Sequence, residues 1–278
     1  MTAARRIGGR PALVPPGLWP IDATAAWSAG FVFLCILGWI ASLIVMGDMD
    51  QGPGTSLHDF PTFLICWVIM LTAMMLPSEM LYLRAYSAFL ENGSVASYGR
   101  FVSLACFVAG YGVAWVVYGA LAYVLDAVVR ASASDFVSWF RAGPLLVGSV
   151  LFLAGVYQVS PWKNACLIHC RSPLSYFARN WHPGRLGSLR MGLTHGLVCV
   201  GCCWALMAVM FAVGAMSLVW MAVLTLFMFA EKILPFGRYL TLPIAVFLWS
   251  LGIWIALAPD SAPLLKNPLL FSGICLAG

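Results

Sequence analysis

The chain has 278 residues, of which 62% are hydrophobic and only 9% are charged. A soluble domain carries about 25% charged residues, so a soluble globular protein is excluded, and the high apolar content also excludes intrinsic disorder. The composition predicts a polytopic membrane protein. The basic residues behind the net charge of +5 are scattered between apolar stretches and do not indicate nucleic-acid binding.

Seven stretches are apolar enough for a membrane-spanning helix, which needs about 20 such residues. The first is predicted to be a retained span rather than a cleaved signal peptide. One helix over 190–234 would be about 70 Å long, so we place a break near Gly214. In chain order the predicted spans are 25–46, 60–83, 101–126, 143–162, 190–213, 216–234 and 239–258.

These spans predict an all-α fold, a polytopic membrane helix bundle in one domain over residues 25–258. A segment at 1–24 precedes the bundle and a short tail at 259–278 follows it. The longest polar connection, 163–189, is rich in Cys and His.

The basic residues predict the orientation, because Lys and Arg are enriched in cytoplasmic loops. With the N-terminus in the cytoplasm and the C-terminus outside, twelve of the 15 Lys and Arg residues fall on the inner side. The three on the outer side are Arg130, Arg141 and Lys266. We therefore expect a multi-pass protein of the cytoplasmic (inner) membrane, with 163–189 in the cytoplasm.

The strongest chemical signal is the stretch GLTHGLVCVGCCWALM at 192–207. On a helix, His195, Cys199, Cys202 and Cys203 share an arc of about 100° with Met210. Thiolate, imidazole and thioether are ligands for soft or borderline metals. His195 and Cys203 lie about 12 Å apart along the helix axis, so one ion cannot bind the whole stripe. Ligands from other helices, or a second ion, are needed.

Packing is the competing interpretation of the same stripe. Cys is commonly buried as a small hydrophobic residue, and Gly192-x-x-x-Gly196 is typical of close helix contacts in membranes. A His inside a membrane helix is costly without a role. The set as a whole therefore favours metal or redox chemistry.

Three further segments carry candidate ligands near the same membrane depth. Cys166 and Cys170 are spaced i,i+4 after the fourth span, with an irregular loop as the alternative. The segment MLTAMMLPSEM supplies Met74 and Glu79, where Pro77 is expected to kink the helix. Glu231-Lys232 either extends to the interface, or Glu231 faces the bundle as a ligand while Lys232 pairs with Glu79.

These segments resemble the predicted metal-binding integral membrane proteins of domain-of-unknown-function family 2182. The resemblance rests on AMMLPSE at 73–79, YQVSPWK at 157–163 with the two cysteines that follow, HGLVCVGCCWALM at 195–207, and Glu231-Lys232-x-x-Pro235. It covers about residues 60–255. It implies a membrane location and a bound metal, without a substrate.

The working hypothesis is a copper or zinc site at the cytoplasmic end of the bundle, for metal delivery, sensing or translocation. Methionines favour copper, whereas Cys and His with a carboxylate suit zinc. The expected partners are the lipid bilayer, the metal ion, and either a soluble metal carrier or further copies of the chain. The alternatives are a metal- or thiol-dependent membrane oxidoreductase and a structural subunit. The predicted ligands are His195, Cys199, Cys202, Cys203, Cys166, Cys170, Glu79, Met74 and Glu231.

Overall fold

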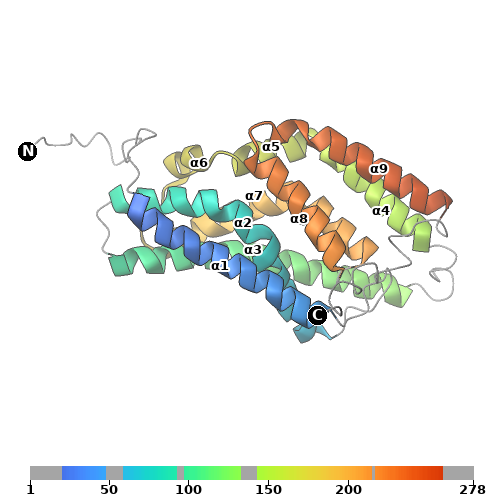
Figure 1. Ribbon diagram of the computed structural model, residues 1–278, viewed down its shortest axis with the longest axis horizontal. Coiled ribbons are helices and arrows are strands. Elements are labelled where there is room, and N and C mark those ends of the chain that lie inside the picture. Colours follow the sequence, from blue (N-terminus) through green and yellow to red (C-terminus); the bar gives the residue numbers. More distant parts are fainter. Residues whose placement is uncertain (1–20, 48–58, 93–96, 133–142, 215–216, 259–278) are drawn as a thin grey trace, which may run out of the picture.

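A computed structural model describes residues 21–47, 59–92, 97–132, 143–214 and 217–258. Helices make up its regular structure, and no strand occurs in these ranges, so the all-α prediction is confirmed. Successive long helices run in alternating directions along the long axis (Figure 1). They are α1 (Ile21–Met46), α2 (Phe60–Asn92), α3 (Ser97–Ser132), α4 (Gly143–Gln158), α5 (Pro161–Cys170), α6 (Pro173–Asn180), α7 (Gly184–Val213), α8 (Leu218–Ile233) and α9 (Thr241–Leu257), with a short 3-10 helix, η1 (Gly237–Tyr239), before α9.

Fewer helices meet the requirements for a membrane span than the seven that the sequence predicts. Four described stretches are long and apolar enough, and the bent pair α4–α5 would make a fifth. They are Phe60–Leu90, Gly99–Val129, Gly184–Val213 and Gly237–Leu257, with Pro144–Gln158 plus Pro161–Cys170 as the pair. The other two predicted spans correspond to α1, where the apolar stretch among the described side chains is Val32–Met46, and to α8, which has 16 residues. The predicted segments 1–20 and 259–278 lie outside the described residues.

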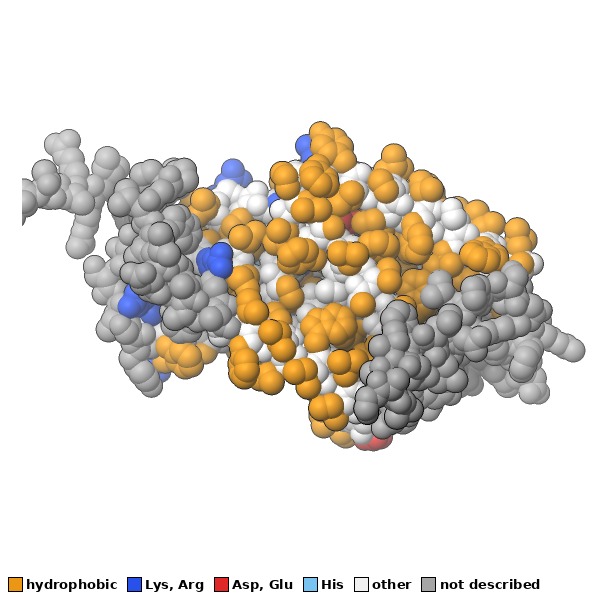
Figure 2. Space-filling model, viewed as in Figure 1, with side chains coloured by type: hydrophobic (Ala, Val, Ile, Leu, Met, Phe, Trp, Pro, Cys, Tyr) orange, Lys and Arg blue, Asp and Glu red, His pale blue; other side chains and the backbone are white. Residues whose placement is uncertain are grey.

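The surface of the bundle has the composition that a lipid environment requires. Hydrophobic side chains cover the middle of the face in Figure 2, and its Lys and Arg side chains lie toward the end that carries α6. Along α3, exposed aliphatic residues recur at intervals of three or four, at Val113, Val117, Leu121, Val124 and Val128. Apolar side chains of this kind are stable in contact with lipid tails. The chain is therefore suited to a membrane.

The chain bends between α4 and α5, inside the region where one span and a polar loop are predicted. The two helices meet at 66°. Ser160 caps α5 by accepting a hydrogen bond from the Lys163 amide, and Pro161 occupies the first turn, where its missing N–H costs nothing. The predicted polar segment 163–189 is thus largely helical, and α5 turns back against α7. This bend brings Cys170 into the protein interior.

α7 is the central helix of the bundle, and it ends where the sequence predicts. Gly214 follows its last residue with a φ of 128°, a conformation that favours glycine, and donates a hydrogen bond to the Met210 carbonyl. α7 packs closely along α3 through glycines. A Cβ on Gly192 would collide with the Phe107 carbonyl, and one on Gly110 with the Leu189 carbonyl.

Replacing Gly110 with alanine is expected to lower the free energy of unfolding by about 1–3 kcal/mol, the usual cost of overpacking. The added methyl group would meet α7 backbone, which cannot move as a side chain can. Gly112→Ala on the same helix is the matched control, because a Cβ there meets nothing within 4 Å. Unfolding in detergent micelles measures both. Equal stability of the two variants would contradict the close α3–α7 contact.

Candidate metal centre

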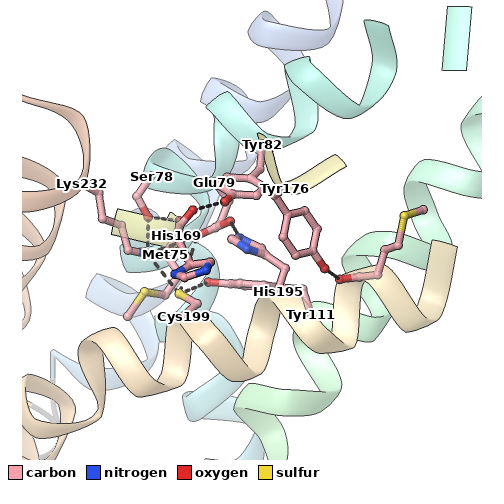
Figure 3. A network of polar contacts seen from close by, with 11 residues as sticks. Met75, Ser78, Glu79, Tyr82, Tyr111, His169, Tyr176, His195, Cys199 and Lys232 are labelled. Carbon is pink, nitrogen blue, oxygen red and sulfur yellow. Dashed lines mark hydrogen bonds and ion pairs between the residues drawn. The ribbon is translucent and has the colours of Figure 1, made fainter. Parts of the chain in front are cut away.

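Three helices meet at one buried carboxylate, Glu79 of α2 (Figure 3). Its Oε2 lies 2.6 Å from Nε2 of His195 on α7, and its Oε1 lies 3.1 Å from Nζ of Lys232 on α8. The three side chains are almost fully enclosed by protein. Since an unpaired charge is costly in such surroundings, the carboxylate and the ammonium fix α2 and α8 relative to each other. The predicted alternative in which Lys232 pairs with Glu79 is confirmed.

The Lys232 ammonium uses all of its hydrogen-bonding capacity. Nζ carries three donors, and it lies 3.1 Å from each of Ser78 Oγ, Glu79 Oε1 and Cys199 Sγ. The Cys199 thiol also lies 3.7 Å from Glu79 Oε1 and 3.2 Å from the Tyr111 hydroxyl. One thiol of the predicted stripe is therefore joined directly to the ionic network.

Aromatic rings hold the His195 imidazole in place. It stacks on Tyr82 with ring centroids 3.7 Å apart. The Tyr82 hydroxyl donates to the His169 carbonyl, which ties α2 to α5. Tyr176 of α6 also contacts the imidazole, and its hydroxyl donates to the Met191 carbonyl at 2.6 Å. Burial raises the pKa of Tyr176, which keeps this phenol a neutral donor. The orientation of His195 is thus fixed by Glu79 and by its ring neighbours.

Four thiols gather where α5 packs against α7. Cys199, Cys202 and Cys203 are buried on α7, and Cys170 reaches them from the end of α5. The Cys170 thiol interacts with those of Cys199 and Cys202, and Cys203 interacts with the same two. The eight cysteines in the described ranges are free thiols. A cluster of thiols from two helices is therefore available for chemistry.

The fifth predicted cysteine, Cys166, lies at the edge of this cluster. It is half-buried, and its Sγ packs against the backbone of Gly201. Met74 is fully buried in the main core. The structure thus brings together Cys170, Cys199, Cys202 and Cys203, with Glu79 and His195 beside them, and it leaves Cys166 at the margin.

Glu231 belongs to a second buried network. Its Oε2 lies 2.7 Å from Nζ of Lys163, and the Gln158 amide bridges both groups. The Arg171 guanidinium donates to the backbone carbonyls of Glu231 and Pro235. The prediction placed Lys163 in a cytoplasmic loop, whereas the structure buries it completely. The bend before α5 accounts for the difference, because it turns Lys163 toward α8.

Sequence reasoning missed several residues of both networks. Ser78, Tyr82, Tyr111 and Gln158 are of common types in common surroundings, and their roles depend on partners far along the chain. Lys163 offered a usable signal, since it lies only two residues after Pro161 at the end of an apolar stretch. A lysine there either reaches the interface or needs a buried anion.

The thiol cluster suits a soft metal by its donor chemistry. Thiolate and thioether ligands select Cu(I), and the surrounding core keeps water away. In the described part of the chain, no three His, Cys, Asp or Glu side chains are already arranged as a metal site. Binding therefore requires the thiols to converge. The thiols of Cys170, Cys202 and Cys203 lie near enough to one another to interact, so the donors start from neighbouring positions.

A family model with the description "PpoB2: Copper chaperone" matches residues 64–255. This range contains all four segments that carry the resemblance to a metal-binding membrane family, and the match supports the metal-related part of that prediction. The description names copper; zinc has no support from it. No curated protein and no solved structure matches the chain.

Proposed function

The chain belongs to the PpoB2 family of copper chaperones, and from this premise we propose that it binds Cu(I) within a membrane helix bundle and delivers it to an acceptor. The observation that carries the proposal is the buried cluster of Cys170, Cys199, Cys202 and Cys203. Copper is the cargo here. Glu79 and His195 position the groups beside the cluster, and they are not required as ligands.

Two lysines suit the cluster to a cation bound by thiolates. Lys232 interacts electrostatically with Cys199 and Cys203, and Lys163 interacts with Cys202 and Cys203. A Cu(I) ion bound by two or more thiolates carries net negative charge, and charges interact strongly where water is scarce. The ammonium groups would offset this charge, so the bundle can hold a charged complex in its interior.

We also propose a location and an orientation for the chain. The N-terminus would lie in the cytoplasm and the C-terminus outside, in a cytoplasmic membrane, with α5 and α6 at the inner surface. Five arginines support this orientation, because they lie in or next to α5, α6, the start of α7 and η1. They are Arg171, Arg179, Arg185, Arg190 and Arg238. A soluble copper carrier would then reach the thiol cluster from the cytoplasm.

The test is copper binding by the full chain, purified in detergent under reducing, anaerobic conditions without a metal-affinity tag. We expect the wild type to retain stoichiometric Cu(I) against a competing chelator and to prefer it over Zn(II). Cys199→Ser/Cys203→Ser should lose this copper, because serine oxygen is a poor ligand for Cu(I).

Cys66→Ser is the matched control for the double variant. Cys66 is equally buried, but it lies 13 residues before Glu79 on α2, about 20 Å along the helix axis. This variant should bind copper as the wild type does. A folded wild type that binds no copper, or a double variant that binds it fully, would overturn the proposal.

A further inference from the structure

The methionines of the bundle face inward to an unusual degree. Leucine, isoleucine and valine occur both in the core and on the lipid-facing surface. Among the described residues, no methionine is exposed, and all except the half-buried Met80 are buried. In a membrane there is little hydrophobic reason to sort methionine from leucine in this way. The buried ones are Met46, Met70, Met74, Met75, Met191, Met207, Met210, Met221 and Met228.

The ionic network sets a common level on three helices, because Glu79, Cys199 and Lys232 lie within 3.7 Å of one another. α2 runs opposite to α7, since Tyr86 reaches back to Ser188 at 2.6 Å. α8 also runs opposite to α7, because only a short connection joins them (Figure 1). Residues that precede Glu79 on α2 or Lys232 on α8 therefore lie on the same side of the ionic network as residues that follow Cys199 on α7. This side points away from α5 and α6.

A first tier of sulfur atoms lies one helical turn beyond that level. Met75 on α2 and Met228 on α8 each precede their network residue by four positions, and Cys203 on α7 follows Cys199 by four. Four residues correspond to about 6 Å along a helix and to a turn of about 40° around it. All three side chains therefore lie on the same helix faces as the residues of the ionic network, one turn farther along each helix.

A second tier lies about 12–17 Å beyond the same level. Met207 and Met210 supply it from α7, Met70 from α2 and Met221 from α8. Met210 lies within about 20° of Cys199 around α7, and Met221 within about 20° of Met228 around α8. The four side chains are all buried in the same core cluster as the thiols.

We infer that the methionines of the two tiers form a thioether route for Cu(I). The route leads from the cysteine cluster to the end of the bundle opposite α5 and α6. The second tier, Met70, Met207, Met210 and Met221, is its binding site. The inference rests on the proposed function, which supplies the ion at the cysteines. It makes the chain a protein that moves copper through the membrane as well as one that holds it.

Ligand exchange describes each step along this route. A Cu–thioether bond forms as a Cu–thiolate bond breaks, and copper remains Cu(I) throughout. The released thiolate keeps its negative charge beside Lys232. Thioethers are neutral and bind no proton at ordinary pH, so the outer part of the route needs no further charged residues. This explains how an apolar half-bundle can conduct a soft cation.

The experiment compares copper uptake into proteoliposomes that contain a Cu(I)-responsive dye. Met207→Leu/Met210→Leu replaces two thioethers with side chains of similar volume, a change that cores tolerate. We expect it to slow uptake at least about tenfold, a loss typical of disturbing a metal site. Copper binding at the cysteines, measured on the same preparation in detergent, should match the wild type.

Met191→Leu is the matched control, because Met191 is buried on the same helix but lies eight residues from Cys199 in the opposite direction. It should transport as the wild type does. Uptake by the double variant at the wild-type rate would overturn the route, as would a wild type that binds copper at the cysteines and transports none. A wild type without bound copper would refute the proposed function itself, and the route would fall with it.

Discussion

Replacing Lys232 with methionine is expected to lower the free energy of unfolding by about 3–5 kcal/mol, the usual cost of breaking a buried ion pair from one side. The change removes the donor shared by Ser78, Glu79 and Cys199. It leaves the Glu79 carboxylate buried with His195, which balances its charge only when protonated. Chemical unfolding in detergent micelles, followed by circular dichroism, measures the difference from the wild type.

The second half of this test removes both charges. Glu79→Gln/Lys232→Met should recover part of the lost stability, because no unpaired charge remains in the core. Arg185→Met is the control on α7, where the side chain is exposed, and its effect should stay within about 0.5 kcal/mol. A Lys232→Met variant as stable as the wild type, or a double variant less stable than Lys232→Met, would show that the pair does not stabilise the fold.

The helices were predictable because hydropathy reports the environment of a whole segment. Every predicted span overlaps a helix. The break at Gly214 was predictable because one helix over 190–234 would be longer than a membrane span requires. The bend between Gln158 and Pro161 was not predictable in the same way. A proline after an apolar helix is compatible with an end, a kink or a reversal, and the packing of α5 against α7 selects among them.

The site was predictable only where its residues share one helix. The stripe of His195, Cys199, Cys202 and Cys203 follows from the helical repeat alone. The partner of Glu231 does not, because Lys163 lies 68 residues away and its position depends on the bend before α5. Glu79 and Lys232, which are 153 residues apart, were paired only as one of two alternatives. Buried charges demand partners, but the fold decides which ones they find.

Cys170→Ser is expected to weaken Cu(I) binding at least about 100-fold, since even groups that only support metal ligands are typically worth 10–100-fold. Cys170 is the one thiol of the cluster that comes from α5, and it interacts with both Cys199 and Cys202. Without it, the remaining thiols belong to α7 alone. Three thiols on one helix cannot surround an ion as thiols from two helices can, so copper should bind loosely.

Cys166→Ser on the same helix tests whether position or sulfur content matters. Cys166 lies one turn before Cys170, is half-buried, and packs against Gly201 at the margin of the cluster. Copper binding by this variant should stay close to that of the wild type in the same chelator competition. Equal losses in the two variants would place both α5 thiols in the site, and a loss in Cys166→Ser alone would move the site toward the exposed side of α5. We expect the two variants to differ because the Cys170 thiol interacts with Cys199 and Cys202 and can bind the same ion. The Cys166 thiol would first have to leave its contact with Gly201.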